Sequence, residues 1–205
     1  MVSVLSINAT HQMEVIMGKI FVTSDWHFNH DREFIWKARG FNSIEEMNQA
    51  IVERHNNIVT SEDDVYVLGD LMLGGPDKMN EGLELIKQMN GKLHIVRGNH
   101  DTERRWLAYP TLPNVVECKD AIYLKCGKYH FYLTHFPCLT GNLEKETLTQ
   151  MTLNLYGHTH QKSNFFEDRP YMYHVGVDSH ECFPICLTDI VAAMRNKVIE
   201  CEEQL

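Results

Sequence analysis

The sequence predicts an α/β protein in which two β-sheets pack together and helices lie outside them. Segments typical of strands and helices alternate through residues 19–97, and short strands dominate the second half. No Pro-, Gly- or Ser-rich linker divides the chain. Because alternating strands and helices favour a layered fold with right-handed crossovers, we expect one α/β domain.

The first half follows the order strand, helix, strand, helix, strand. Ser43 and Glu46 have the spacing of a capping box, which predicts the start of a helix. Residues 80–90 predict a second helix that ends at Gly91. Short β-rich runs predict three buried strands, at residues 19–24, 65–68 and 93–97.

The second half is richer in β-structure. Residues 115–125 and 129–134 flank Gly127, a pattern that predicts a β-hairpin. A final helix is expected over residues 187–200, with Thr188 as its N-cap. Two further β-rich runs predict strands at 153–156 and 172–177.

Length and charge narrow the classes of function. The 205 residues suffice for one well-filled domain. A net charge of −9 argues against a protein that coats nucleic acid, because phosphate backbones favour clustered Lys and Arg. Acidity does not exclude a phosphate substrate, since bound divalent metals can reverse the local field.

Other features concern the compartment and the ends of the domain. No apolar run of 18 or more residues is present, so no membrane span or membrane partner is expected. None of the six cysteines forms a CxxC pair, which favours reduced thiols in a cytoplasmic protein. Residues 1–16 read as an N-terminal extension and 17–205 as the domain.

Five short segments carry side chains that can bind metal ions. Each follows a predicted strand, where α/β folds place binding groups. Carboxylate, amide and imidazole groups together suit Mn²⁺, Fe²⁺, Zn²⁺ or Co²⁺. The segments are Ser24-Asp25-Trp26-His27, Gly69-Asp70, Gly98-Asn99-His100-Asp101, Thr134-His135 and Gly157-His158-Thr159-His160.

The spacing inside two of these segments suggests how the side chains point. Asp25 and His27 are two residues apart, so in an extended segment they would face the same side. His158 and His160 repeat that spacing. One aspartate can bridge two ions, because its carboxylate has two oxygens.

The order DxH, GD, GNHD, H and GHTH resembles the calcineurin-like metallophosphoesterase superfamily, over residues 25–160. The family fold is a β-sandwich flanked by helices, in four layers α/β/β/α. The resemblance implies two divalent ions, with manganese favoured, a bridging role for Asp70 and a catalytic role for His100. One ion would be held by Asp25, His27, Asp70 and His160, and the other by Asp70, Asn99, His135 and His158.

The activity implied by the resemblance is hydrolysis of a phosphodiester or phosphomonoester by a hydroxide held between two metal ions. The protein phosphatases of the family carry GDxxDRG, whereas Leu73 and Gly74 stand at the second Asp and the Arg here. Loss of that phosphate-clamping Arg favours a diester. Residues 25–30 have the DxHFxH form of the first segment and so resemble the compact bacterial and phage phosphoesterases. Small bacterial members of the family commonly pair, so the resemblance also implies a possible homodimer.

Several side chains outside the proposed ligand set allow two interpretations, one functional and one structural. His30 could contact a substrate phosphate or be an exposed loop residue. His174 could contact the substrate or support a metal ligand, or lie on the outer face of a strand. Asp101 could orient His100 or hold a turn. Arg39 could clamp a phosphate but is interpreted as a solvated surface charge, and Asp178 is interpreted as a turn residue.

Two other functions stay open at this stage. A nucleotide pyrophosphatase or nuclease would use the same metals, although the charge of −9 disfavours long nucleic acid and favours a small phosphate ester or nucleotide. A scaffold that has lost activity is the alternative outside the enzymes. It is disfavoured because every ligand position holds a competent side chain.

Overall fold

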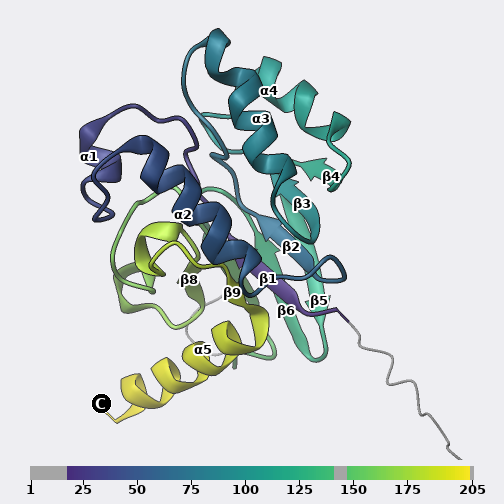
Figure 1. Cartoon of the computed structure of the whole chain (residues 1–205). Helices are drawn as coiled ribbons and strands as arrows, with labels where there is room; N and C mark the ends of the chain where they lie inside the picture. The colour runs from purple at the N-terminus through teal and green to yellow at the C-terminus, as the bar shows by residue number, and fades with distance from the viewer. Residues whose placement is uncertain (1–17, 141–146, 204–205) are drawn as a thin grey trace, which may run out of the picture.

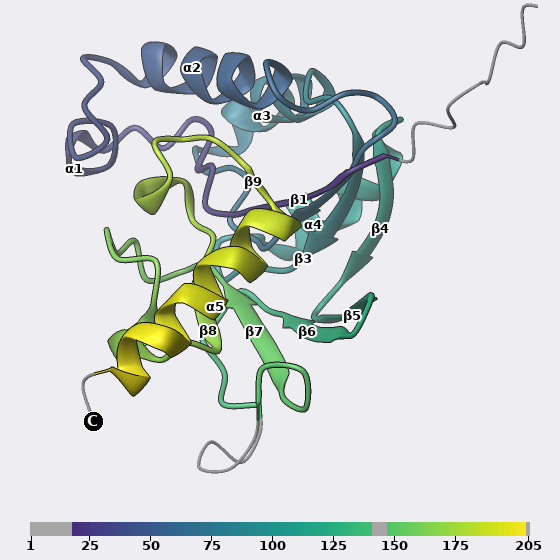
Figure 2. The same cartoon turned by 90° about the horizontal axis from the view of Figure 1, so that it is seen from below.

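A computed structural model describes residues 18–140 and 147–203, so the predicted extension 1–16 lies outside the described residues. Its strands form a five-stranded sheet, in the order β4-β3-β2-β1-β9, and a four-stranded sheet, in the order β5-β6-β7-β8. The two sheets pack face to face with helices beside them (Figures 1 and 2). This arrangement confirms the predicted class of two packed sheets flanked by helices.

The first sheet contains the three strands predicted in the first half. Its central strands are parallel and almost fully buried, which explains their continuous apolar sequences. The short β9 runs antiparallel to β1 at one edge. The strands are β1 (Ile20–Thr23), β2 (Asp64–Val67), β3 (Lys92–Val96), β4 (Val115–Lys119) and β9 (Ile185–Cys186).

The second sheet begins with the predicted hairpin and continues with parallel strands. The β-rich run 115–125 is two strands, because β4 pairs with β3 in the first sheet and the chain then crosses to the second. Residues Asp120 and Ala121 separate the two strands. The members of this sheet are β5 (Ile122–Cys126), β6 (Tyr129–Leu133), β7 (Thr152–Tyr156) and β8 (Met172–His174).

The described chain contains the α-helices α1 (Glu33–Trp36), α2 (Ile44–Asn56), α3 (Met79–Lys87), α4 (Glu103–Ala108) and α5 (Leu187–Glu202). The capping serine is confirmed, since Ser43 Oγ accepts from the Glu46 amide at 3.1 Å. Thr188 is wrong as a cap: β9 ends at Cys186 and the helix begins directly after it. None of the described helices is long and apolar enough to cross a membrane.

The helices bury two separate cores. Figure 2 shows α2 and α3 together on the outer side of the first sheet, and Met47, Ile86 and Val65 belong to one buried apolar cluster. Helix α5 turns its buried side chains, including Ile190 and Met194, toward the core between the sheets. This packing fixes the strand ends from which the candidate site is built.

Candidate metal centre

Loops at the carboxyl ends of strands from both sheets meet at one place. The amide of Asp25, after β1, donates to the Gly69 carbonyl after β2 at 3.0 Å. A bridge between Ser24 and Gly176 joins the end of β1 to the segment that follows β8. The five predicted segments therefore converge, although they span residues 24–160 of the chain.

The backbone of these loops is left-handed and not extended as predicted. A positive φ is uncommon for residues other than glycine, and each such residue costs about 1–3 kcal/mol. Trp26 packs into the core, while the residues on either side of it face the site. The ligand residues with positive φ are Asp25 (59°), His27 (51°), Asp70 (55°), His158 (68°) and His160 (47°).

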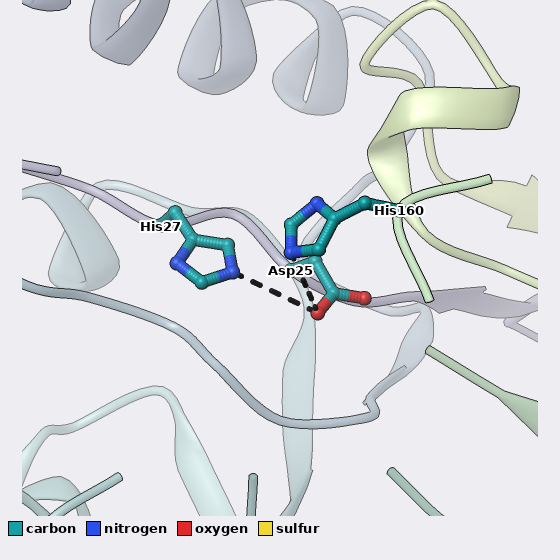
Figure 3. Close-up of side chains that lie close together, drawn as sticks. All are labelled: Asp25, His27 and His160. Carbon is teal, nitrogen blue, oxygen red and sulfur yellow. Dashed lines mark ion pairs between the residues drawn. The ribbon is translucent and has the colours of Figure 1, made fainter. Parts of the chain in front are cut away.

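Asp25 is the centre of the first group of side chains. Figure 3 shows the rings of His27 and His160 directed at one carboxylate oxygen of Asp25. The Nε2 atoms of His27 and His160 lie 3.8 Å and 4.0 Å from Asp25 Oδ1. These three side chains can offer their ligand atoms to a single ion.

Asp70 joins this group to a second one. Its Oδ2 lies 3.5 Å from Nε2 of His27 and 3.5 Å from Nε2 of His135. The side-chain oxygen of Asn99 lies 2.8 Å from His135 Nε2 and 2.8 Å from His158 Nδ1. The structure thus brings all seven predicted ligands together, and Asp25, Asp70 and His135 form a second group that could hold an ion.

Two glycines allow the loops to approach so closely. A Cβ atom on Gly98 would collide with the Asp70 carboxylate, and one on Gly157 would collide with Asp25 and Ser24. The glycines of the predicted segments therefore serve the packing of carboxylates against backbone.

A divalent cation fits this arrangement. Both ring nitrogens of His27 are buried without a hydrogen-bond partner, which is costly unless another group satisfies them. Burial opposes a charge on His135, yet Asp70 and Asp25 raise its pKa to about 9. The carboxylates of Asp25 and Asp70 supply negative charge beside His135, and the carboxylate, amide and imidazole donors of the site suit a borderline divalent ion.

His100 stands at the open side of the site. Its side chain is 43% exposed, and its Nε2 lies 3.9 Å from Asp70 Oδ2. Asp101 is turned away and accepts hydrogen bonds from the amides of Gly98 (2.8 Å) and Asp70 (2.9 Å). Of the two readings of Asp101, the structure supports the one in which it holds a turn.

The two predicted substrate contacts occupy different positions. The His30 ring lies 5.2 Å from that of His27 and 6.4 Å from that of His100, so it borders the site. Burial, followed by the neighbouring histidines, lowers the pKa of His30 to about 4. His174 has 0% exposure, and its Nδ1 lies 2.8 Å from Ser179 Oγ. A substrate cannot reach it there, so the structure contradicts a substrate contact and supports a buried supporting position.

Two residues of the site were misread from the sequence. Arg39 and Asp178 form an ion pair at 2.9 Å, with side-chain exposures of 1% and 7%, and Asp178 Oδ2 lies 2.8 Å from His160 Nδ1. Burial opposes ionisation of Asp178, but His160 and Arg39 hold its pKa below the usual range. The two partners are 139 residues apart, so no local pattern could reveal the pair.

Comparison with known families decides the assignment. The model of the calcineurin-like phosphoesterase superfamily domain matches residues 18–177. The chain belongs to the calcineurin-like phosphoesterase superfamily. The match contains all five predicted segments, and membership implies a hydrolase that acts on phosphate esters with divalent metals.

Individual relatives extend over most of the chain. A Methanocaldococcus jannaschii protein without an assigned function is 32% identical over 159 residues, which is 76% of each chain. The gene 66 protein of Mycobacterium phage L5 is 24% identical, covering 80% of this phosphoesterase and 88% of its own length. A crystal structure of a protein of unknown function from Aquifex aeolicus shares the fold, with a TM-score of 0.63, 22% identity and coverage of 85% and 98%.

Proposed function

We propose that the protein hydrolyses a small phosphodiester with two divalent ions held by the seven side chains of the candidate metal centre. The observation that carries this proposal is the position of Asp70. Its Oδ2 lies 3.5 Å from ring nitrogens in both ligand groups, which suits a carboxylate shared by two ions. Manganese is the preferred metal of the proposal.

The residues divide between the two ions as the family resemblance suggests. Asp25, His27 and His160 would hold one ion, and Asn99, His135 and His158 the other, with Asp70 shared. When bound, such ions lower the pKa of a water molecule and neutralise phosphoryl oxygens. The protein supplies oriented ligands: His135 Nδ1 donates to the Leu68 carbonyl at 2.7 Å, which leaves Nε2 free to coordinate.

His100 would act on the leaving group. Its exposed ring can reach a bound ester, and its amide donates to Asp70 Oδ1 at 2.8 Å, which anchors the backbone beside the metals. A water molecule would supply the oxygen that bonds to phosphorus, and the His100 ring would donate a proton to the leaving oxygen as the P–O bond breaks. The products would be an alcohol and a phosphomonoester.

Two features support a small diester. No arginine stands where the protein phosphatases clamp a monoester, and His30 is held uncharged at neutral pH by its lowered pKa. A monoester carries one more negative charge than a diester, so it depends more on a cationic side chain such as the Arg that Gly74 replaces. The net charge of −9 disfavours long nucleic acid.

A nucleotide pyrophosphatase or nuclease is the second candidate. Exposed aromatic rings favour it: Phe34, 69% exposed, stands edge-on to His30 at 5.9 Å, and Phe136, 48% exposed, lies 4.6 Å from His158. Rings at the mouth of a site can stack on a base.

The test is hydrolysis by metal-depleted protein to which Mn²⁺ is added back. We expect bis-p-nitrophenyl phosphate to be cleaved with a higher kcat/KM than p-nitrophenyl phosphate, and EDTA to abolish both activities. Preference for the monoester would refute the diester assignment. Uptake of metal without cleavage of either ester, or of a dinucleotide or nucleoside diphosphate, would favour the scaffold alternative.

A further inference from the structure

A buried ion pair lies directly behind the candidate metal centre. The guanidinium of Arg39 donates to both oxygens of Asp178, at 3.0 Å and 2.9 Å. Neither side chain is open to solvent, as their exposures of 1% and 7% show. A buried ion pair seldom adds stability over apolar packing, because both charges lose their hydration. Its position therefore suggests another role.

The carboxylate of the pair fixes the ring of His160. Asp178 Oδ2 lies 2.8 Å from His160 Nδ1, so it can accept a hydrogen bond from the N–H group at that position. That bond leaves Nε2 as the coordinating atom, and Nε2 points toward Asp25 Oδ1 (Figure 3). A carboxylate behind a histidine commonly sets the tautomer and raises the basicity of a metal-binding ring.

The guanidinium also fixes the backbone of the first segment. Arg39 donates to the carbonyls of Asp25 at 2.9 Å and Trp26 at 3.1 Å. These peptide groups belong to the segment in which Asp25 and His27 have a positive φ. One side chain thus joins the segment that follows β1 to the carboxylate that orients His160.

Arg39 and Asp178 contact residues that are assigned to only one of the two ions. Arg39 contacts the peptide groups next to Asp25 and His27, and Asp178 contacts the ring of His160. Within the described residues, neither of them contacts His135 or Asn99, which are oriented by other partners. A loss of the pair should therefore weaken one ion more than the other.

We propose that Arg39 and Asp178 are positioning residues that set the affinity for the ion at Asp25, His27 and His160, and not for the ion at Asn99, His135 and His158. The inference rests on the proposed function, since it presupposes two bound ions. It adds a determinant of metal affinity that makes no contact with the metal or the substrate.

Asp178→Asn tests the proposal. An asparagine is uncharged, and its NH2 group replaces one carboxylate oxygen, so it would face a donor nitrogen of Arg39 or of His160 and could not keep all of the contacts that both oxygens of Asp178 make. Calorimetric titration of metal-free protein with Mn²⁺ should show one site weakened by about 10–100-fold and the other unchanged. Asp168→Asn is the matched control, since it removes the same charge from a carboxylate that is 83% exposed and paired with Lys197.

Arg39→Lys is the second variant, and it keeps the charge. A single ammonium group cannot reach both carboxylate oxygens and two carbonyls, so the same site should weaken. Thermal unfolding of the metal-free proteins shows whether each variant is folded. If one of the two variants does not fold, the metal affinities of the other test the proposal. Wild-type affinity at both sites in a folded variant, or equal loss at both, would overturn the proposal. Absence of Mn²⁺ binding by the wild type would instead refute the proposed function.

Discussion

Replacement of His100 by asparagine is expected to lower kcat for a phosphodiester by about 10²–10⁴-fold, which is the usual contribution of a general acid. The His100 ring is the exposed imidazole nearest to Asp70, at 3.9 Å, yet it is not among the ligand groups. Asparagine keeps the backbone amide that donates to Asp70 Oδ1. The variant should therefore retain both ions while losing the proton donor.

The measurement is steady-state kinetics together with the metal content of the same sample. His130→Asn is the control, because His130 lies on β6 and contacts Tyr123, outside the site. It should keep the wild-type kcat. A loss of metal in step with activity in the His100 variant, or an unchanged kcat, would contradict the assigned role.

Asp101→Ala is expected to lower the free energy of unfolding by about 3–5 kcal/mol, the range for removing one partner of a buried charged network. The Asp101 carboxylate is 2% exposed. It accepts from the amides of Asp70, Leu71 and Gly98 and from the hydroxyl of Tyr109. Alanine would leave these donors buried without a partner.

Urea denaturation of metal-free protein measures this effect apart from metal binding. Tyr109→Phe removes one donor from the same carboxylate and should cost about 1 kcal/mol. Asp168→Ala, at an exposed site, should stay within about 0.5 kcal/mol of the wild type. A loss of under 1 kcal/mol for Asp101→Ala would mean that water or a rearranged turn replaces the carboxylate.

The sequence was informative where a feature is local. Each ligand segment directly follows a strand, so a β-rich run and the polar residues after it could be recognised together. Within each sheet the parallel strands place their carboxyl ends at one edge, which is where the ligand segments lie. Ser43 predicted the start of α2 because a cap depends on residues three apart.

Features set by tertiary contacts were missed. Arg39 has the sequence surroundings of a surface arginine, and only the approach of Asp178 from another part of the chain buries it. The left-handed backbone at Asp25 and His160 has the same origin, since close packing of the loops stabilises it. The β-rich run 115–125 is interrupted near Asp120 because its two halves join different sheets. β-propensity does not show which sheet a strand joins.

The most direct test of the central claim is the number of metal ions bound by each chain. Metal-depleted protein is saturated with Mn²⁺, freed of excess ion and measured by elemental mass spectrometry against protein concentration. We predict two ions for the wild type and fewer than two for Asp70→Asn, because Asp70 is the proposed shared ligand. A wild-type chain that retains no metal, or an Asp70→Asn chain that retains two ions, would contradict the account.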